Sequence, residues 1–232
     1  MPKIHFVADF AAAKAACHAI KKKTVVGFDI ELSGGCVSLL QIATSATDAY
    51  IFDVTLLGQQ LFDASYLLPI LCNPRITKLC YDCRGDSETL FRKHGAKVYG
   101  LYDLQIVFTS LFQRPWDPHL KGISHAARVA MPNSKAVEGF AAGKKRMKRS
   151  FSAMTRHGDC NFERPLSKEA LMYCAQDTTM LMQMHEVWRN YVDFHEVLTI
   201  SSLRAKRHIF REAPAVMYTV DFPCLVNCCF LE

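Results

Sequence analysis

Short apolar runs separated by turn residues dominate the early part of the chain. Three strands are predicted by the apolar runs at residues 24–31, 36–43 and 49–53. The links between these runs, Ser33-Gly34-Gly35 and Thr47-Asp48, are short and have the composition of hairpin turns. We therefore expect the main sheet to begin with three antiparallel strands.

A helical pattern precedes these strands. Residues 9–22 are rich in alanine and begin with Asp9 as a candidate N-cap. The three lysines 21–23 close this helix, because cations are favourable at a helix C-terminus. Residues 4–8 are apolar enough to form a short strand ahead of that helix. Two further helical patterns end near Leu71. Helical patterns therefore precede and follow the predicted hairpins along the chain.

Beyond Leu71 the pattern alternates between strand and helix. The predicted elements are a strand at 76–81, a helix at 85–94, a strand at 98–101 and a helix at 103–112. Strand–helix–strand alternation predicts parallel pairing. Antiparallel strands followed by parallel ones give the chain order of a ribonuclease-H-like α/β fold, a mixed sheet flanked by helices.

The last part of the chain is less regular. Residues 120–129 predict a helix, and Ser167 caps a longer one that we expect over residues 168–190. Residues 132–165 show little periodicity. We expect one domain over residues 1–192 and a C-terminal extension, 193–232, that packs on it.

Composition adds limits on the class of protein. The chain has 232 residues, half of them hydrophobic, which is enough for one well-formed core. The formal net charge of +6 is compatible with a polyanionic partner without requiring one. No apolar run approaches the ~18 residues of a membrane span, so we expect no membrane partner. Nothing in the sequence indicates a protein partner.

Cysteine use indicates the cellular compartment. The ten cysteines are scattered, and the first residues lack the apolar stretch of a secretory signal. We therefore expect reduced thiols and an intracellular location, in the cytoplasm or nucleus, with the mitochondrion left open. Cys80 and Cys83 form a C-x-x-C pattern without a second pair, so core and turn positions are favoured over a zinc site.

Carboxylates occur at three places where the predicted elements direct them to defined faces. Asp29 and Glu31 lie two residues apart in an apolar strand and therefore share one of its faces. Tyr173 and Asp177 are four residues apart in a predicted helix and also share a face. Asp86 lies between these pairs, where a strand turns into a helix.

Together these residues suit two hard divalent cations acting on a phosphodiester. Taken singly, an Asp-x-Glu can be solvated, an aspartate can cap a helix, and the tyrosine and last aspartate can be a core residue and a surface charge. Their joint order favours Asp29, Glu31, Asp86 and Asp177 as ligands of Mg²⁺ or Mn²⁺. Tyr173 would hold the attacking water through its hydroxyl.

These residues lie in segments that resemble the three motifs of the DEDD superfamily of 3′–5′ exonucleases, in the subclass with a motif-three tyrosine. The segments are Phe28-Asp29-Ile30-Glu31, then Asp82-Cys83-Arg84-Gly85-Asp86-Ser87, then Arg164-Pro165-Leu166-Ser167 followed by Tyr173 and Asp177. The resemblance covers roughly residues 24–190 and is closest to ribonuclease D and Egalitarian-like exonuclease domains. It implies a ribonuclease-H-like fold, two divalent metals and release of nucleoside monophosphates from a 3′ end.

The expected function is therefore metal-dependent 3′–5′ exonuclease activity on single-stranded RNA. One alternative is a non-catalytic RNA-binding adaptor, because some Egalitarian-like proteins have lost catalytic residues. Another is a 3′–5′ exonuclease that acts on DNA. A ribonuclease-H-like endonuclease would yield internal fragments and gives no reason for a tyrosine four residues before Asp177.

A basic run precedes the third motif. It contains Lys144, Lys145, Arg146, Lys148 and Arg149. These cations would bind RNA phosphates in a salt-dependent way. A solvated flexible loop or a nuclear-import signal would have the same composition.

Overall fold

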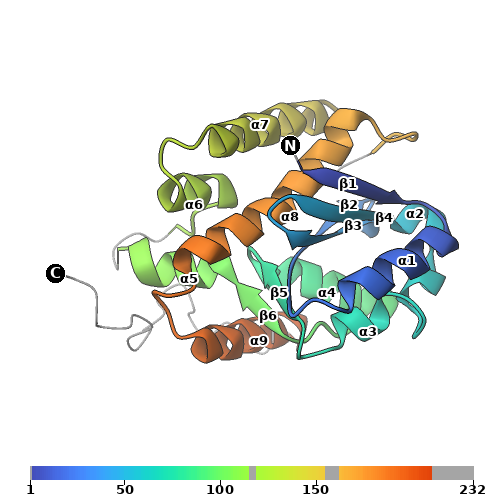
Figure 1. The fold of residues 1–232 in the computed structure, drawn as a ribbon, viewed down its shortest axis with the longest axis horizontal. Helices are drawn as coiled ribbons and strands as arrows, with labels where there is room; N and C mark the ends of the chain where they lie inside the picture. Colours follow the sequence, from blue (N-terminus) through green and yellow to red (C-terminus); the bar gives the residue numbers. More distant parts are fainter. Residues whose placement is uncertain (1, 115–118, 155–161, 211–232) are drawn as a thin grey trace.

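A six-stranded mixed sheet forms the centre of the protein (Figure 1). The computed structural model describes residues 2–114, 119–154 and 162–210. The strands are β1 (Lys3–Val7), β2 (Val25–Ser33), β3 (Cys36–Ser45), β4 (Asp48–Asp53), β5 (Thr77–Cys80) and β6 (Leu101–Asp103), in the order β1-β4-β3-β2-β5-β6. β2, β3 and β4 are antiparallel, whereas β5 and β6 add in parallel. The predicted α/β fold with antiparallel and then parallel strands is confirmed.

Two features of the sheet depend on local backbone conformation. The β2–β3 hairpin turns at Gly34 and Gly35, whose φ angles are 57° and 71°, values at which a side chain would be strained. β6 begins three residues later than predicted, after Gly100, which also has a positive φ. The short strand β1 pairs in parallel with β4, and the sequence pattern contained no signal for this pairing.

Helices cover both faces of the sheet. They are α1 (Phe10–Ile20), α2 (Val54–Leu57), the 3₁₀ helix η1 (Gln59–Phe62), α3 (Leu68–Leu71), α4 (Cys83–His94), α5 (Leu104–Phe112), α6 (Ile123–Ala130), α7 (Lys135–Met154), α8 (Lys168–Trp188) and α9 (Phe194–Phe210). Figure 1 shows α8 crossing one face, with α1, α3 and α4 on the other side. None of the described helices combines the length and the apolar character needed to cross a bilayer.

Side chains of β2 alternate between these two layers. Val26, Phe28 and Ile30 are buried in the core that also contains α1, α3 and α4 residues. The intervening positions face α8, and they include Asp29 and Glu31. The apolar flanks therefore fix the strand in the core while the two carboxylates project toward the crossing helix.

The segment with little periodicity contains a regular 20-residue helix, α7. The expectation that residues 132–165 lack a clear element is therefore wrong for most of their length. Val137, Phe140 and Ala141 are buried at helical spacing, but glycines and the basic run concealed this spacing in the sequence. α7 packs against α6 and α8.

The C-terminal extension begins with α9, which packs against α4, α5 and β6. Its buried face includes Val197, Ser201 and Ala205. Residues 211–232 lie outside the described part of the chain. The described beginning of the extension is thus joined to the core at the edge of the sheet that carries β6.

Gly27 determines how closely α8 approaches β2. A Cβ atom at this position would lie 2.3 Å from the backbone oxygen of Thr178 and 3.4 Å from the Cβ of Ala43. Any larger side chain would therefore push α8 away from the strand. Thr178 follows Asp177, so the same contact sets the distance between Asp177 and the carboxylates of β2.

We predict that Gly27→Ala lowers the free energy of unfolding by about 1–3 kcal/mol, because the new methyl group overpacks the helix–strand contact. Chemical denaturation measures this change. Gly139→Ala is the matched control, because Gly139 is helical and a Cβ there meets no atom within 4 Å. Equal stability of both variants would contradict the role given to Gly27.

Candidate active site

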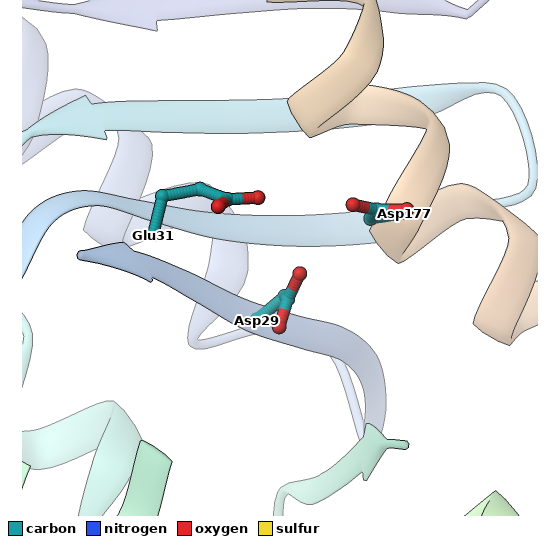
Figure 2. Close-up of side chains that lie close together, drawn as sticks. All are labelled: Asp29, Glu31 and Asp177. Atoms are coloured by element: carbon teal, nitrogen blue, oxygen red, sulfur yellow. The ribbon is translucent and has the colours of Figure 1, made fainter. Parts of the chain in front are cut away.

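Three carboxylates from two elements converge on one point. Asp29 and Glu31 of β2 and Asp177 of α8 each offer an oxygen atom, and these atoms lie within 4.8 Å of one another. Figure 2 shows the three side chains directed toward a common space between the strand and the helix. Asp177 and Glu31 are buried and Asp29 is half-buried. The structure therefore brings together residues separated by almost 150 positions.

Asp86 lies beside this group of three. It is in the first turn of α4, directly after β5, and it shares a hydrogen bond with Asp29. The charge of Glu31 also acts on it. All four carboxylates predicted from the sequence are thus in one neighbourhood, with Asp29 at its centre. Tyr173 is one turn before Asp177 on α8 and is half-buried.

The strand-to-helix turn that directs Asp86 is held by the buried carboxylate of Asp103, which the sequence pattern identified only as the start of a helix. Asp82 begins α4 in the left-handed region, with φ at 64°. Asp103, at the end of β6, accepts hydrogen bonds from the backbone N–H groups of Asp82 at 2.9 Å and Cys83 at 3.2 Å. This buried aspartate therefore fixes the strand-to-helix turn from which Asp86 projects.

α9 supports the same corner. Arg204 donates to Oδ2 of Asp103 at 2.7 Å and to the side-chain oxygen of Gln105 at 2.6 Å. The hydroxyl of Ser201 accepts a hydrogen bond from the backbone N–H of Asp103 at 2.9 Å. No sequence pattern connected Arg204 with Asp103, because about a hundred residues separate them. The first part of the extension is therefore part of the support for the site.

Arg164 anchors the segment that leads into α8. Its guanidinium donates to both oxygens of the buried Asp53, at 2.8 and 2.9 Å, and to the hydroxyl of Ser38 at 3.1 Å. Ser167 then caps α8 by accepting from the N–H of Ala170 at 3.1 Å. These contacts join the segment before α8 to the beginning of β3 and the end of β4, and so help to position Tyr173 and Asp177 over the sheet.

The crowding of carboxylates shifts their protonation. Burial raises the pKa of Asp29 to about 7, and the charge of Asp177 adds to this effect while Lys144 opposes it. Burial and the charges of Asp29 and Glu31 place the pKa of Asp86 well above its usual range. Burial also raises the pKa of Asp177, against the lowering effects of Lys144 and Tyr173. The cluster therefore needs positive charge to stay fully ionised.

One cation already reaches the cluster from α7. The ammonium Nζ of Lys144 donates to Oδ1 of Asp177 at 2.5 Å. It also lies 4.9 Å from the ring centroid of Tyr173 and 5.5 Å from that of Phe140. Sequence reasoning grouped Lys144 with the RNA-binding run. Its helical spacing from Val137, Phe140 and Ala141 was the signal that placed it on the inner face.

The basic run does not form a single exposed patch. Lys145, Arg146 and Arg149 are exposed on α7, whereas Lys144 is turned inward to Asp177. The side chain of Lys148 lies outside the described part of the chain. Three of the five predicted phosphate-binding residues are therefore placed on the outer surface of the helix.

The acidic cluster has the chemistry of a divalent-cation site. Its ligand atoms are carboxylate oxygens, the donors that Mg²⁺ and Mn²⁺ prefer. The second oxygen of Asp177, Oδ2, is buried and accepts no hydrogen bond from the described residues. A buried carboxylate oxygen without a donor is costly unless a cation is its partner. The residues of the acidic cluster therefore suit the divalent cation that was predicted from the sequence.

A family model described as a 3′-5′ exonuclease matches residues 4–193, which include all four carboxylates, Tyr173 and Lys144. The chain belongs to the 3′–5′ exonuclease family. The match runs from the second residue of β1 to just beyond α8. The residues that match the family model therefore contain the whole acidic cluster.

One curated relative is the mouse piRNA biogenesis protein EXD1. It is 34% identical to this exonuclease over 96 residues, which are 40% of this chain and 16% of the mouse protein. The alignment therefore spans a small part of that relative.

Solved structures share the fold over most of the chain. The GMP complex of Trypanosoma brucei RNase D covers 97% of this exonuclease and 69% of its own chain, with a TM-score of 0.75 and 22% identity. The complex of the same enzyme with RNA U12 gives a TM-score of 0.72 and 22% identity, with 97% and 76% covered. Escherichia coli RNase D gives 0.66 and 19%, with 89% and 51% covered. At these identities the likeness concerns the fold, which is that of an RNase D-like exonuclease domain.

We predict that Asp103→Asn lowers the free energy of unfolding by about 3 kcal/mol, because an amide cannot satisfy both the backbone donors and the Arg204 guanidinium. Urea denaturation monitored by circular dichroism measures the loss. Asp63→Asn is the control, since Asp63 is exposed at the end of η1; it should change stability by less than about 0.5 kcal/mol. An Asp103→Asn protein with wild-type stability would show that Asp103 does not stabilise the turn from which Asp86 projects.

Proposed function

We propose that this exonuclease removes nucleoside monophosphates one at a time from the 3′ end of single-stranded RNA, with two divalent cations, Mg²⁺ or Mn²⁺, as cofactors. The observation that carries the proposal is the convergence of Asp29, Glu31 and Asp177, with Asp86 beside them. Four carboxylates in one neighbourhood provide enough oxygen ligands and negative charge for two cations.

Each residue has a role that follows from its place. Asp29 lies between the other carboxylates on a central strand, which suits a ligand shared by both cations. Asp177 and Asp86 would also hold the cations through their carboxylate oxygens. Glu31 lies toward the β2–β3 hairpin, where its carboxylate would accept a hydrogen bond from the terminal 3′ hydroxyl.

Tyr173 completes the proposed machinery. Its hydroxyl would orient the attacking water for in-line approach to the last phosphodiester, and the rigid α8 holds it there. When bound, the divalent cations would supply Lewis-acid stabilisation of the charge that develops on the phosphate oxygens. The protein residues thus provide orientation and charge placement, which are the main requirements of phosphoryl transfer.

RNA is favoured over DNA by the kind of relatives found. The mouse relative is named for piRNA biogenesis, and the T. brucei RNase D crystal contains RNA. The exposed cations Lys145, Arg146 and Arg149 on α7 would bind phosphates along the incoming strand. Discrimination against DNA would require contacts to the 2′ hydroxyl.

A non-catalytic RNA-binding adaptor is the second candidate function. The contact between Lys144 and Asp177 favours it, because an internal cation can hold the carboxylates together without a metal. An adaptor would bind single-stranded RNA equally well with and without divalent cations and would leave its length unchanged.

We predict that Asp29→Asn abolishes shortening of single-stranded RNA and leaves the fold intact, because the loss of a carboxylate removes the central ligand. Rates should fall by about 10³-fold or more. A time course with 5′-labelled and 3′-labelled RNA, in Mn²⁺, Mg²⁺ or EDTA, measures both rate and direction. A 3′ label should appear at once in mononucleotides, while a 5′ label should give a descending ladder.

Asp63→Asn serves as the control for this series, and a DNA oligomer of the same sequence tests the sugar preference. Normal turnover by Asp29→Asn in Mg²⁺ would refute the site assignment. RNA binding by the wild-type protein without any shortening in either metal would establish the adaptor instead.

We further predict that Tyr173→Phe lowers kcat by about 10²-fold with little change in KM, because the hydroxyl acts on the water and not on the bound strand. Single-turnover kinetics with saturating enzyme separate this effect from binding. A variant with unchanged kcat would show that the water is oriented by another group.

A further inference from the structure

Lys144 is placed in the carboxylate cluster by its helix. It lies on the inner face of α7, and its ammonium is 2.5 Å from Oδ1 of Asp177, one of the three clustered carboxylates. α7 in turn packs on α8, the helix that carries Asp177. The contact thus joins two elements that are already held together by buried side chains.

The aliphatic and aromatic surroundings keep the lysine in this position. Phe140, one turn earlier on α7, is 1% exposed, and the ammonium lies near its ring and near that of Tyr173. Two aromatic faces and a carboxylate together form a cation-binding surface. The Lys144 side chain is 27% exposed, so solvent reaches one side of it and the side chain has room to move outward.

The charges around Lys144 come from more than one carboxylate. Burial alone lowers the pKa of Lys144, but the charges of Asp177, Asp29 and Glu31 raise it above its ordinary value. All three clustered carboxylates therefore act on the same ammonium. A divalent cation bound among these carboxylates would be attracted by the same three charges. It would bind Oδ1 or Oδ2 of Asp177.

We propose that Lys144 is the internal counter-cation of the cluster and that it competes with the divalent cation for Asp177. This inference rests on the proposed function, because it takes Asp29, Glu31 and Asp177 as the metal ligands. In the metal-free protein the ammonium stabilises the crowded carboxylates. The ammonium occupies Oδ1 of Asp177 and repels an approaching divalent cation, so the lysine lowers the metal affinity of the site.

Metal binding to the full chain, without RNA, tests the proposal independently of catalysis. Free Mn²⁺ is measured by electron paramagnetic resonance, at the same pH for all variants. Lys144→Met keeps the length and the contacts with the aromatic rings but removes the charge. It should bind Mn²⁺ about tenfold more tightly, the ratio that corresponds to a lost charge-assisted hydrogen bond.

Matched variants separate charge from shape. Lys144→Gln, a second neutral variant, should also bind Mn²⁺ more tightly, while Lys144→Arg should stay near the wild-type affinity. Lys135→Met changes an exposed lysine at the start of the same helix and should have no effect. In EDTA the two neutral Lys144 variants should melt at a lower temperature than the wild type, and saturating Mn²⁺ should abolish this difference.

Two results would overturn the proposal in distinguishable ways. If the wild type binds Mn²⁺ and neither neutral variant binds it more tightly, Lys144 does not compete, while the metal site stands. If neither the wild type nor any Lys144 variant binds Mn²⁺, both the competition and the metal assignment in the proposed function are wrong.

Discussion

The close contact between α8 and β2 is the constraint on which the site depends. At Gly27 the strand has no side chain, and the backbone of Thr178 occupies the place that a Cβ would take. Asp177 is therefore near enough to Asp29 and Glu31 for their oxygens to lie within 4.8 Å. Without this approach the carboxylates would belong to separate surfaces, and no single cation would reach them all.

The same close contact brings several carboxylates together in a partly buried space, which is unfavourable when all of them are ionised. Burial raises the pKa of Asp29 and of Asp86, and neighbouring carboxylate charges raise both further. Lys144 supplies a positive charge from within the chain, and we propose that divalent cations supply it during the reaction. In this proposal a cluster that binds divalent cations serves a nuclease, whereas a cluster neutralised by Lys144 alone serves an RNA-binding adaptor.

Two buried aspartates hold the rest of the site, and each pairs with an arginine far away in the sequence. Asp103 with Arg204 fixes the corner from which Asp86 projects, and Asp53 with Arg164 fixes the start of α8. In both pairs the carboxylate also accepts backbone N–H groups, so a charged group in the interior is satisfied on several sides. The beginning of the C-terminal extension is therefore a structural part of the exonuclease domain's site.

The sequence by itself determined the mixed sheet and the candidate carboxylates, because alternation in β2 and helical spacing in α8 are local properties that assign each side chain to a face. It also contained the spacing of α7, although glycines and basic residues concealed it. Only the tertiary structure decided that Lys144 contacts Asp177 and that Arg204 and Arg164 hold buried aspartates. These contacts join residues about 30 to 110 positions apart, and such pairings depend on how the elements pack, which no local pattern records.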